Sequence, residues 1–221
     1  MKFRYLTFDC YGTLVDWRKG IAESLESVGI TSGLGPGALL RAYVAAEKEQ
    51  EKTYQKYRDV LKKAALALSQ SLGVKLGPDA AERFSSSVPH WPAFSDSRSF
   101  LKRMGEAGFA RYILSNVDTD ILKETIRRNR FEVDGYVTAE EVRSYKPERG
   151  HWLRFLERTG ARKEEVLHVA QSVFHDILPA QELGVSSVWV NRYREAIPAG
   201  AEPLLIVDNL RSLGGLLEAW V

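Results

Sequence analysis

The sequence predicts an α/β protein with a doubly wound, mainly parallel sheet and an inserted helical domain. Three observations support this prediction. A strand-like segment at residues 3–8 ends in an acid; residues 16–92 follow without a strand; and strands alternate with helices from residue 93 onward. Strands that are separated by helices form βαβ units with parallel strands. A strand-free helical run inside such a pattern indicates an insertion. We therefore expect a core domain of residues 1–15 and 93–221 and a helical domain of residues 16–92.

The first strand is predicted from residues 3–8, which are rich in aromatic and β-branched side chains. Asp9 follows at once, and Gly12 lets the backbone turn sharply. An acid at the carboxyl end of a buried strand lies where open α/β sheets bind ligands. Asp9 could therefore be a metal ligand, a general base or a nucleophile. It could also cap a loop or the next helix.

The helical insertion is predicted from composition and from the spacing of its apolar residues. Ala, Glu, Lys, Gln and Leu dominate it, Pro78 suits a first helical turn, and Pro89 and Pro92 end it. The expected helices span residues 16–28, 37–50, 54–72 and 78–87.

Beyond residue 93 the pattern alternates. The expected strands span residues 110–114, 135–138, 166–170, 187–190 and 204–207. The expected helices span residues 97–107, 120–129, 150–159, 179–183 and 213–220. Ser115 and Asn116 follow a strand, so they should share a sheet edge with Asp9. They could instead cap the helix that starts near residue 120.

The composition is that of an ordinary globular protein: 221 residues, 44% hydrophobic, 27% charged, with a net charge of +2. Basic residues alternate with acidic ones, so nucleic acid is not an expected partner. Neither a signal peptide nor a membrane-spanning apolar run is present, which predicts a cytoplasmic protein without a membrane partner. Cys10 is the single cysteine, so no intramolecular disulfide can form.

Four segments, in order, resemble the motifs of the haloacid dehalogenase (HAD) superfamily. Asp9-Cys10-Tyr11-Gly12-Thr13-Leu14 resembles the first motif, whose Asp is a nucleophile. The Ser115-Asn116 pair is similar to the second, Lys146-Pro147 to the third, and residues 168–184 to the fourth. The resemblance implies a Rossmann-like core and identifies residues 16–92 as the helical cap. An aromatic residue at Tyr11 resembles the branch that cleaves carbon–halogen bonds, the (S)-2-haloacid dehalogenases.

Two positions argue against the superfamily's magnesium-dependent phosphatases. Those enzymes carry a general acid where this chain has Tyr11, and a metal-binding acid where it has Gln171. Mg²⁺ prefers anionic oxygen ligands, which neither residue supplies. We therefore expect no metal and no cofactor.

The resemblance also implies roles for individual residues. Asp9 would be the nucleophile, Thr13 and Ser115 would hold carboxylate oxygens, Lys146 would orient Asp9, and Asp176 would position the lysine and the hydrolytic water. Substrate- or halide-binding roles are expected for Tyr11, Arg41, Asn116, Ser172, Phe174 and His175.

Several of these residues have a structural alternative. Lys146 and Arg41 could be surface residues, Asp176 could cap the helix at Pro179, Phe174 could be core and His175 structural. The chain also departs from characterised dehalogenases at Val173, where their loop has a halide-holding Asn.

The expected function is that of an (S)-2-haloacid dehalogenase working through an aspartyl ester without metal. Its substrate would be a short 2-haloalkanoic acid or a similar small anion. The alternatives are a magnesium-dependent phosphatase whose cap supplies the acid/base, another HAD-like hydrolase of unknown substrate, and a non-catalytic binding protein. The family also suggests a homodimer.

Overall fold

A single parallel sheet organises the core of the protein. The computed structural model describes residues 3–31 and 35–218. Six strands lie in the order β3-β2-β1-β4-β5-β6, and every neighbouring pair is parallel. They are β1 (Tyr5–Phe8), β2 (Ala110–Ser115), β3 (Gly135–Thr138), β4 (Val166–Ala170), β5 (Ser186–Val190) and β6 (Leu205–Val207). The predicted doubly wound α/β fold is confirmed. The strand order reverses between β1 and β4, which is where such sheets bind ligands.

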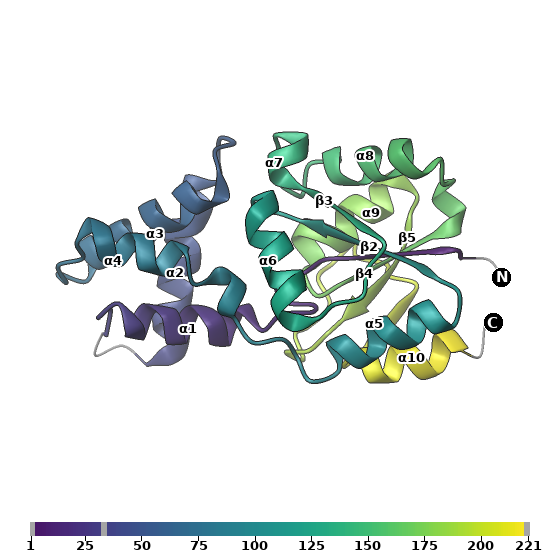
Figure 1. The fold of residues 1–221 in the computed structure, drawn as a ribbon, viewed down its shortest axis with the longest axis horizontal. Helices are drawn as coiled ribbons and strands as arrows, with labels where there is room; N and C mark the ends of the chain where they lie inside the picture. Colours follow the sequence, from purple (N-terminus) through teal and green to yellow (C-terminus); the bar gives the residue numbers. More distant parts are fainter. Residues whose placement is uncertain (1–2, 32–34, 219–221) are drawn as a thin grey trace.

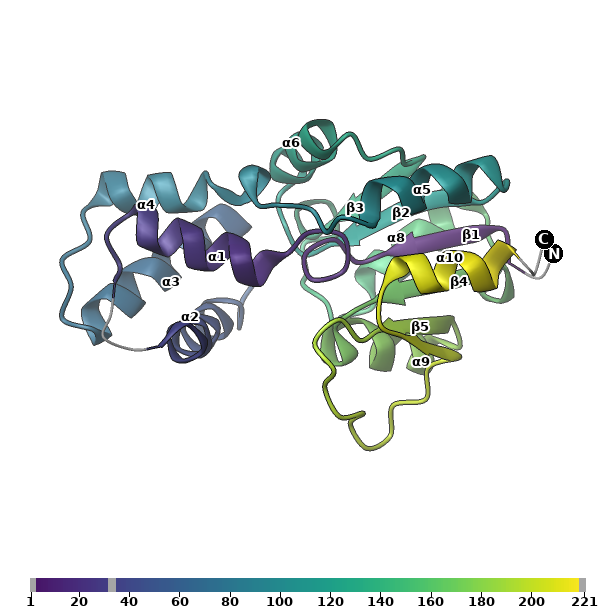
Figure 2. The same cartoon turned by 90° about the horizontal axis from the view of Figure 1, so that it is seen from below.

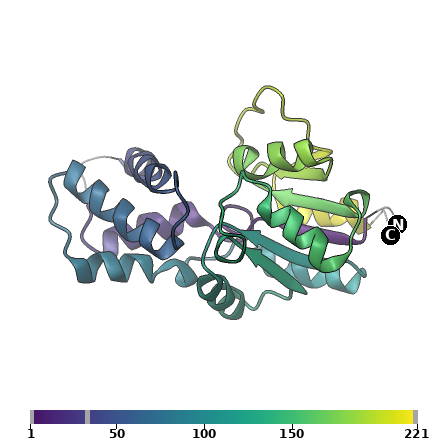
Figure 3. The same ribbon diagram turned by 90° about the horizontal axis from the view of Figure 1, so that it is seen from above.

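Helices cover both faces of this sheet (Figures 2 and 3). One face carries α5 (Ser97–Glu106), α6 (Thr119–Asn129) and α10 (Leu210–Glu218), and the other carries α8 (Gly150–Thr159) and α9 (Leu178–Leu183). Short helical segments complete the core: α7 (Ala139–Val142), η2 (Lys163–Glu165) and η3 (Val173–Ile177). The crossovers are βαβ connections, which place successive parallel strands side by side.

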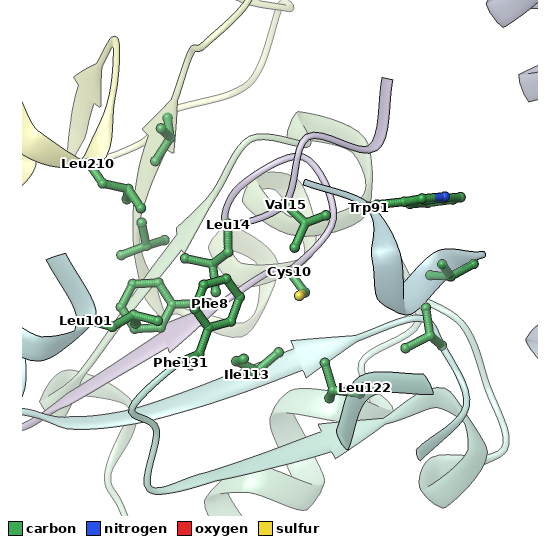
Figure 4. Close-up of a cluster of buried hydrophobic side chains, with 14 of the residues drawn as sticks. Phe8, Cys10, Leu14, Val15, Trp91, Leu101, Ile113, Leu122, Phe131 and Leu210 are labelled. Atoms are coloured by element: carbon green, nitrogen blue, oxygen red, sulfur yellow. The ribbon is translucent and has the colours of Figure 1, made fainter. Parts of the chain in front are cut away.

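The main hydrophobic core lies between β1 and the helices α5, α6 and α10. Figure 4 shows Phe8 of β1 among Leu101, Ile113 and Leu210, side chains that come from α5, β2 and α10. All four are fully buried. The Phe8 ring meets Phe100 edge-on at a centroid distance of 5.9 Å. Each side chain of this size contributes about 1.5–3 kcal/mol when it leaves water, so this core fixes β1 and the acid that follows it.

A separate group of helices stands beside the carboxyl ends of the strands (Figure 1). It consists of α1 (Trp17–Ser27), α2 (Pro36–Gln50), α3 (Tyr57–Ser71), α4 (Pro78–Ser85) and the short η1 (Val88–His90). We call this group the helical lobe. Its own core includes Tyr43 and Phe84, whose rings lie 5.5 Å apart.

The chain enters and leaves the helical lobe through two adjacent segments. Asp16 N donates to Pro92 O at 2.8 Å, and Phe94 N donates to Leu14 O at 3.0 Å. A close contact secures the junction: a Cβ on Gly20 would lie 2.2 Å from the Trp91 ring, so only glycine fits there. The two connections therefore form one compact joint.

A carboxylate of the core also holds the lobe. Asp118 accepts hydrogen bonds from the main-chain N–H groups of Tyr57 at 2.9 Å and Arg58 at 3.0 Å. These N–H groups lie in the first turn of α3, which lacks a side-chain cap of its own. Asp118 thus caps α3 across the gap between lobe and core.

Several elements differ from the sequence prediction. Helix α3 begins at Tyr57, not at residue 54, because Lys56 has the extended backbone of an N-cap. Helix α10 begins at Leu210, where Asn209 Oδ1 accepts from Ser212 N, and the predicted end near residue 220 lies outside the described residues. The segments α7 and η3 were not predicted.

Across the described ranges, no helix has both the length and the apolar character needed to cross a bilayer.

Candidate active site

A cavity of about 410 Å³ lies between the carboxyl ends of the strands and the helical lobe. The core contributes Asp9, Ser115, Lys146, Gln171 and Asp176 to its walls. The lobe contributes Trp17, Arg18, Ile21, Val44, Glu47, Glu51, Tyr57 and Trp91. Most of the predicted site residues therefore meet in one place, although they are far apart in the sequence.

The turn after β1 aims the Asp9 carboxylate into this cavity. Gly12 has φ +113°, which favours glycine, and the turn closes with hydrogen bonds from Leu14 N and Val15 N to Cys10 O. Thr13 Oγ1 donates to Asp9 Oδ2 at 2.9 Å and accepts from Gln171 N at 2.9 Å. Thr13 itself is fully buried and does not line the cavity. Its hydroxyl therefore fixes one carboxylate oxygen of Asp9 from behind.

Lys146 bridges the two acids of the site. Its Nζ donates to Asp9 Oδ1 at 2.8 Å, to Asp176 Oδ1 at 2.7 Å and to Leu114 O at 2.9 Å. The lysine is 3% exposed and all three of its donors have acceptors. The structure therefore contradicts the alternative that Lys146 is a surface residue.

Burial and charge have opposite effects on the pKa values of Asp9, Lys146 and Asp176. Burial is the strongest influence on Asp9 and raises its pKa; Lys146 opposes the rise and the charge of Asp176 adds to it. Burial alone would also raise the pKa of Asp176, but Lys146 and His168 lower it to about 2. Burial disfavours the ammonium form of Lys146, yet the two carboxylates raise its pKa above the ordinary value. The pKa of Asp9 is thus raised and that of Asp176 lowered, and such a separation of two pKa values is typical of catalytic pairs.

His168 supports Asp176 from beneath. Its Nε2 lies 3.0 Å from Asp176 Oδ1, and its Nδ1 lies 2.9 Å from Thr7 Oγ1. A carboxylate only accepts, so Nε2 carries the proton and Nδ1 accepts from the threonine hydroxyl. Asp176 Oδ2 is buried and has no hydrogen-bond partner among the described residues. Because Asp176 lies within η3 and Ser172 caps that segment, the alternative that Asp176 is a helix cap is wrong.

Ser115 ends β2 at the cavity and Asn116 follows it, but the two residues have different hydrogen-bond partners. Ser115 Oγ is buried without a hydrogen-bond partner in the described part of the chain, so it can serve a ligand. Asn116 Oδ1 accepts from Lys146 N at 2.7 Å, and its Nδ2 donates to Lys146 O at 3.1 Å. Neither residue caps α6, whose N-cap is Asp118.

The loop after β4 supplies the remaining core wall. Ser172 Oγ accepts from His175 N at 3.1 Å and lies 3.0 Å from His175 Nδ1. Burial lowers the pKa of His175, so its imidazole is neutral near pH 7. Phe174 lines the cavity but is 53% exposed, which excludes the core alternative. Tyr11 also lines the cavity, and its hydroxyl lies 2.7 Å from Thr125 Oγ1.

Arg41 does not reach the cavity. The residue is exposed, the cavity walls do not include it, and its guanidinium folds back toward Gly37 on its own helix. The expectation that Arg41 faces the substrate is therefore wrong for this structure. The solvent-exposed face of α2 carries it, while Val44 and Glu47 occupy the face that lines the cavity.

Two acids of α2 were missed by the sequence analysis. Glu47 Oε1 accepts from Tyr57 at 2.8 Å and from Tyr43 at 3.1 Å, and burial raises its pKa. Glu51, one turn further, has its pKa raised to about 8 by burial and by the charge of Glu47. The spacing of Glu47 and Glu51 is a signal that could have found them. Like charges four residues apart destabilise a helix, so such a pair suggests a role other than helix stability.

The donor set does not fit Mg²⁺. The Lys146 ammonium lies between the acids Asp9 and Asp176, and neutral Gln171 donates its amide to Glu195 at 3.1 Å. The ranges 3–31 and 35–218 contain no group of three or more His, Cys, Asp or Glu side chains arranged to hold a metal ion. Mg²⁺ prefers anionic oxygen ligands, and the neutral Gln171 supplies none.

Comparisons with known proteins identify the family and the fold. The family model described as haloacid dehalogenase-like hydrolase matches residues 3–184. An (S)-2-haloacid dehalogenase of Pseudomonas fluorescens is 25% identical over 95% of this chain and 94% of its own. One of Pseudomonas putida is 24% identical over 96% and 95%. The fold matches that of L-2-haloacid dehalogenase from Xanthobacter autotrophicus with chloropropionic acid covalently bound, with a TM-score of 0.87, 19% identity, and coverage of 99% and 100%.

Proposed function

The chain belongs to the haloacid dehalogenase-like hydrolase family, and on that premise we propose that it hydrolyses carbon–halogen bonds of (S)-2-haloacids without a metal ion. One observation carries the proposal: a buried lysine bridges Asp9 and Asp176 at 2.8 and 2.7 Å in a cavity that Gln171 also lines. Gln171 is neutral and stands where the family resemblance puts the metal-binding acid of the phosphatases. An ammonium group at this place keeps the acids ionised but leaves no coordination site between them.

Asp9 is the nucleophile in this proposal. One of its carboxylate oxygens attacks C2 of the substrate, the carbon–halogen bond breaks with inversion, and the halide leaves with the bonding electrons. Lys146 and Thr13 each hold one Asp9 oxygen and so fix the direction of attack. Positioning of this kind supplies a large part of the rate in displacement reactions.

Water then hydrolyses the resulting ester. It adds to the side-chain carbonyl carbon of Asp9. The bond between this carbon and the ester oxygen then breaks, which releases the hydroxy acid and a proton. We assign the orientation of this water to Asp176 Oδ2, because Asp176 belongs to the cavity wall and this oxygen has no hydrogen-bond partner among the described residues. Ser115 Oγ, also unpartnered, is the donor that we assign to the substrate carboxylate.

The relatives support this chemistry. Both Pseudomonas proteins are named (S)-2-haloacid dehalogenase, and the Xanthobacter structure contains covalently bound chloropropionic acid. We assign to the helical lobe, residues 16–92, the role of a cap that closes the cavity and limits the access of water. The cytoplasmic location and the homodimer stay predictions.

Halide release tests the proposal directly. With EDTA present, (S)-2-chloropropionate should release chloride and (R)-2-chloropropionate should not. Loss of activity with EDTA and recovery with Mg²⁺ would contradict the metal-independent mechanism. Release of phosphate from a phosphate ester under those conditions would favour the phosphatase alternative.

A further inference from the structure

The lobe side of the cavity is acidic and aromatic. Glu47 and Glu51 line it from the carboxyl-terminal end of α2. The rings of Trp17, Tyr57 and Trp91 line it from α1, α3 and the segment that leaves the lobe. Carboxylates and aromatic side chains in one cavity form a typical binding site for an organic cation, because both groups attract positive charge.

The charges in the cavity do not balance. The described residues that line it include one lysine and one arginine, and both have partners. Lys146 lies between Asp9 and Asp176, and Arg18 pairs with Glu195 at 2.7 Å. Within the described residues, neither Glu47 nor Glu51 forms an ion pair with a basic side chain. The lobe side of the cavity therefore carries unmatched acids.

The position on the helix strengthens this preference. Glu51 is the C-cap residue of α2, a helix of 15 residues, and the carboxyl end of a helix favours cations. Lys48, on the same helix, lies 5.6 Å from the ring centre of Phe174, is exposed, and is not part of the cavity wall. It therefore does not neutralise the two glutamates.

The size of the cavity points the same way. Cavities of 300–1,000 Å³ hold drug-sized ligands, and this one measures about 410 Å³. A short haloacid placed with C2 at Asp9 and its carboxylate at Ser115 would leave the acidic, aromatic side unoccupied. A longer substrate would reach α2 and meet Glu47 and Glu51.

We propose that the substrate is zwitterionic: a 2-halocarboxylate whose far end carries an ammonium group that Glu47, Glu51 and the neighbouring rings bind. This inference rests on the proposed function for the position of the haloacid end. It replaces the expectation of a small anion with a substrate whose two ends are recognised by the core and by the lobe.

A matched pair of halogen-free ligands tests the ammonium site without any chemistry. 5-(Trimethylammonio)pentanoate and 6,6-dimethylheptanoate have the same shape and differ in one positive charge. Calorimetry at pH 9, where Glu51 is ionised, should show that the ammonium compound binds at least about tenfold more tightly. In the double variant Glu47→Gln/Glu51→Gln the difference should fall below about threefold.

The control is Glu49→Gln, which changes an exposed acid of the same helix that pairs with Lys52 at 2.5 Å. It should keep the wild-type preference. Equal binding of the two ligands, tighter binding of the uncharged isostere, or no binding of the ammonium compound at millimolar concentration would each overturn the inference. The wild-type comparison alone decides this, even if the double variant fails to fold.

Chloride release separates this inference from the proposed function. The substrates are (S)-2-chloropropionate and the 2-chloro derivatives of the two ligands. If both derivatives release chloride equally well, the ammonium site is wrong and the dehalogenase proposal stands. If the ammonium ligand binds preferentially but none of the three releases chloride, the dehalogenase proposal is wrong and the ammonium site stands.

Discussion

The side-chain amide of Asn116 binds both main-chain polar groups of Lys146, accepting at 2.7 Å and donating at 3.1 Å. This pair of hydrogen bonds ties the end of β2 to the segment that carries the lysine. The family resemblance gave Asn116 a role in binding substrate or halide. The observed bonds instead lead us to predict that it positions Lys146.

Asn116→Ala should therefore lower kcat more than it raises KM. Misplacing Lys146 by about 1 Å is expected to cost about 10²-fold in turnover, with KM changed less than about threefold. Steady-state chloride release measures both constants. Asn129→Ala is the matched control, because its amide donates to Thr125 O at the end of α6, away from the cavity walls. A raised KM with unchanged kcat would show that Asn116 contacts the substrate.

The nucleophilic role that we propose for Asp9 predicts an isotope pattern. In a single turnover in ¹⁸O water, the first hydroxy acid should be largely unlabelled, and the label should stay in the Asp9 carboxylate. The product oxygen then comes from the protein, whereas a general base would deliver it from water. Mass spectrometry of the product and of the peptide containing Asp9 distinguishes the two mechanisms. Label in the first product, with none in that peptide, excludes the ester.

Removing the cation from the buried trio should destabilise the fold. In Lys146→Met, Asp9 and Asp176 lose their shared partner, and we expect a loss of about 3–5 kcal/mol in the free energy of unfolding at pH 7. Urea denaturation measures it. Lys52→Met, which changes a lysine with 68% exposure of its side chain, should stay within about 0.5 kcal/mol. Equal stability of wild type and Lys146→Met would show that the carboxylates do not need the lysine.

Glu51 predicts a dependence of stability on pH. Its pKa is about 8 in the folded protein against 4.5 ordinarily, so the folded state binds more protons between these values. Stability must therefore fall as the pH rises through this range, with the full penalty above pH 8. The charge of the neighbouring Glu47 also raises the pKa of Glu51. The pKa values of Tyr57 and Tyr145 are raised, so these tyrosines remain neutral in this range.

Glu51→Gln should remove that penalty. At pH 9 the variant should be more stable than the wild type by up to about 5 kcal/mol, and at pH 5 the difference should be below about 1 kcal/mol. Thermal or urea unfolding across this pH range provides the measurement. Glu49→Gln should show no such trend. A parallel pH profile for wild type and Glu51→Gln would mean that Glu51 ionises normally.

Arg41 provides a prediction of no effect. Because the side chain is exposed and lies outside the cavity, Arg41→Ala should change kcat/KM less than twofold and stability by less than about 0.5 kcal/mol. Arg18→Ala is the comparison, since Arg18 lines the cavity and pairs with Glu195. A large loss of activity in Arg41→Ala would require the lobe to move so that α2 turns this face inward.

The sequence predicted the core of the site because the chemistry there is tied to strand ends. Asp9 follows β1 and Ser115 is the last residue of β2, so the sheet alone brings them together, and the motif order adds Lys146 and Asp176. Lobe residues could not be placed in this way. The rotation of α2 about its axis decides whether Arg41 or Glu47 lines the cavity, and that rotation depends on tertiary packing. The segment η3 begins at the Ser172 cap, and no periodic pattern of apolar residues marks it in the sequence.

The joint between lobe and core has an evolutionary consequence. Leu14 and Phe94 are joined by a main-chain hydrogen bond at 3.0 Å, so the two ends of the insertion are neighbours. A short peptide could bridge them, and a different insertion of any length could start and end at the same place without disturbing a strand. Recombination at this joint would therefore replace α2, with the ammonium site that we propose there, while the residues at the strand ends are inherited unchanged.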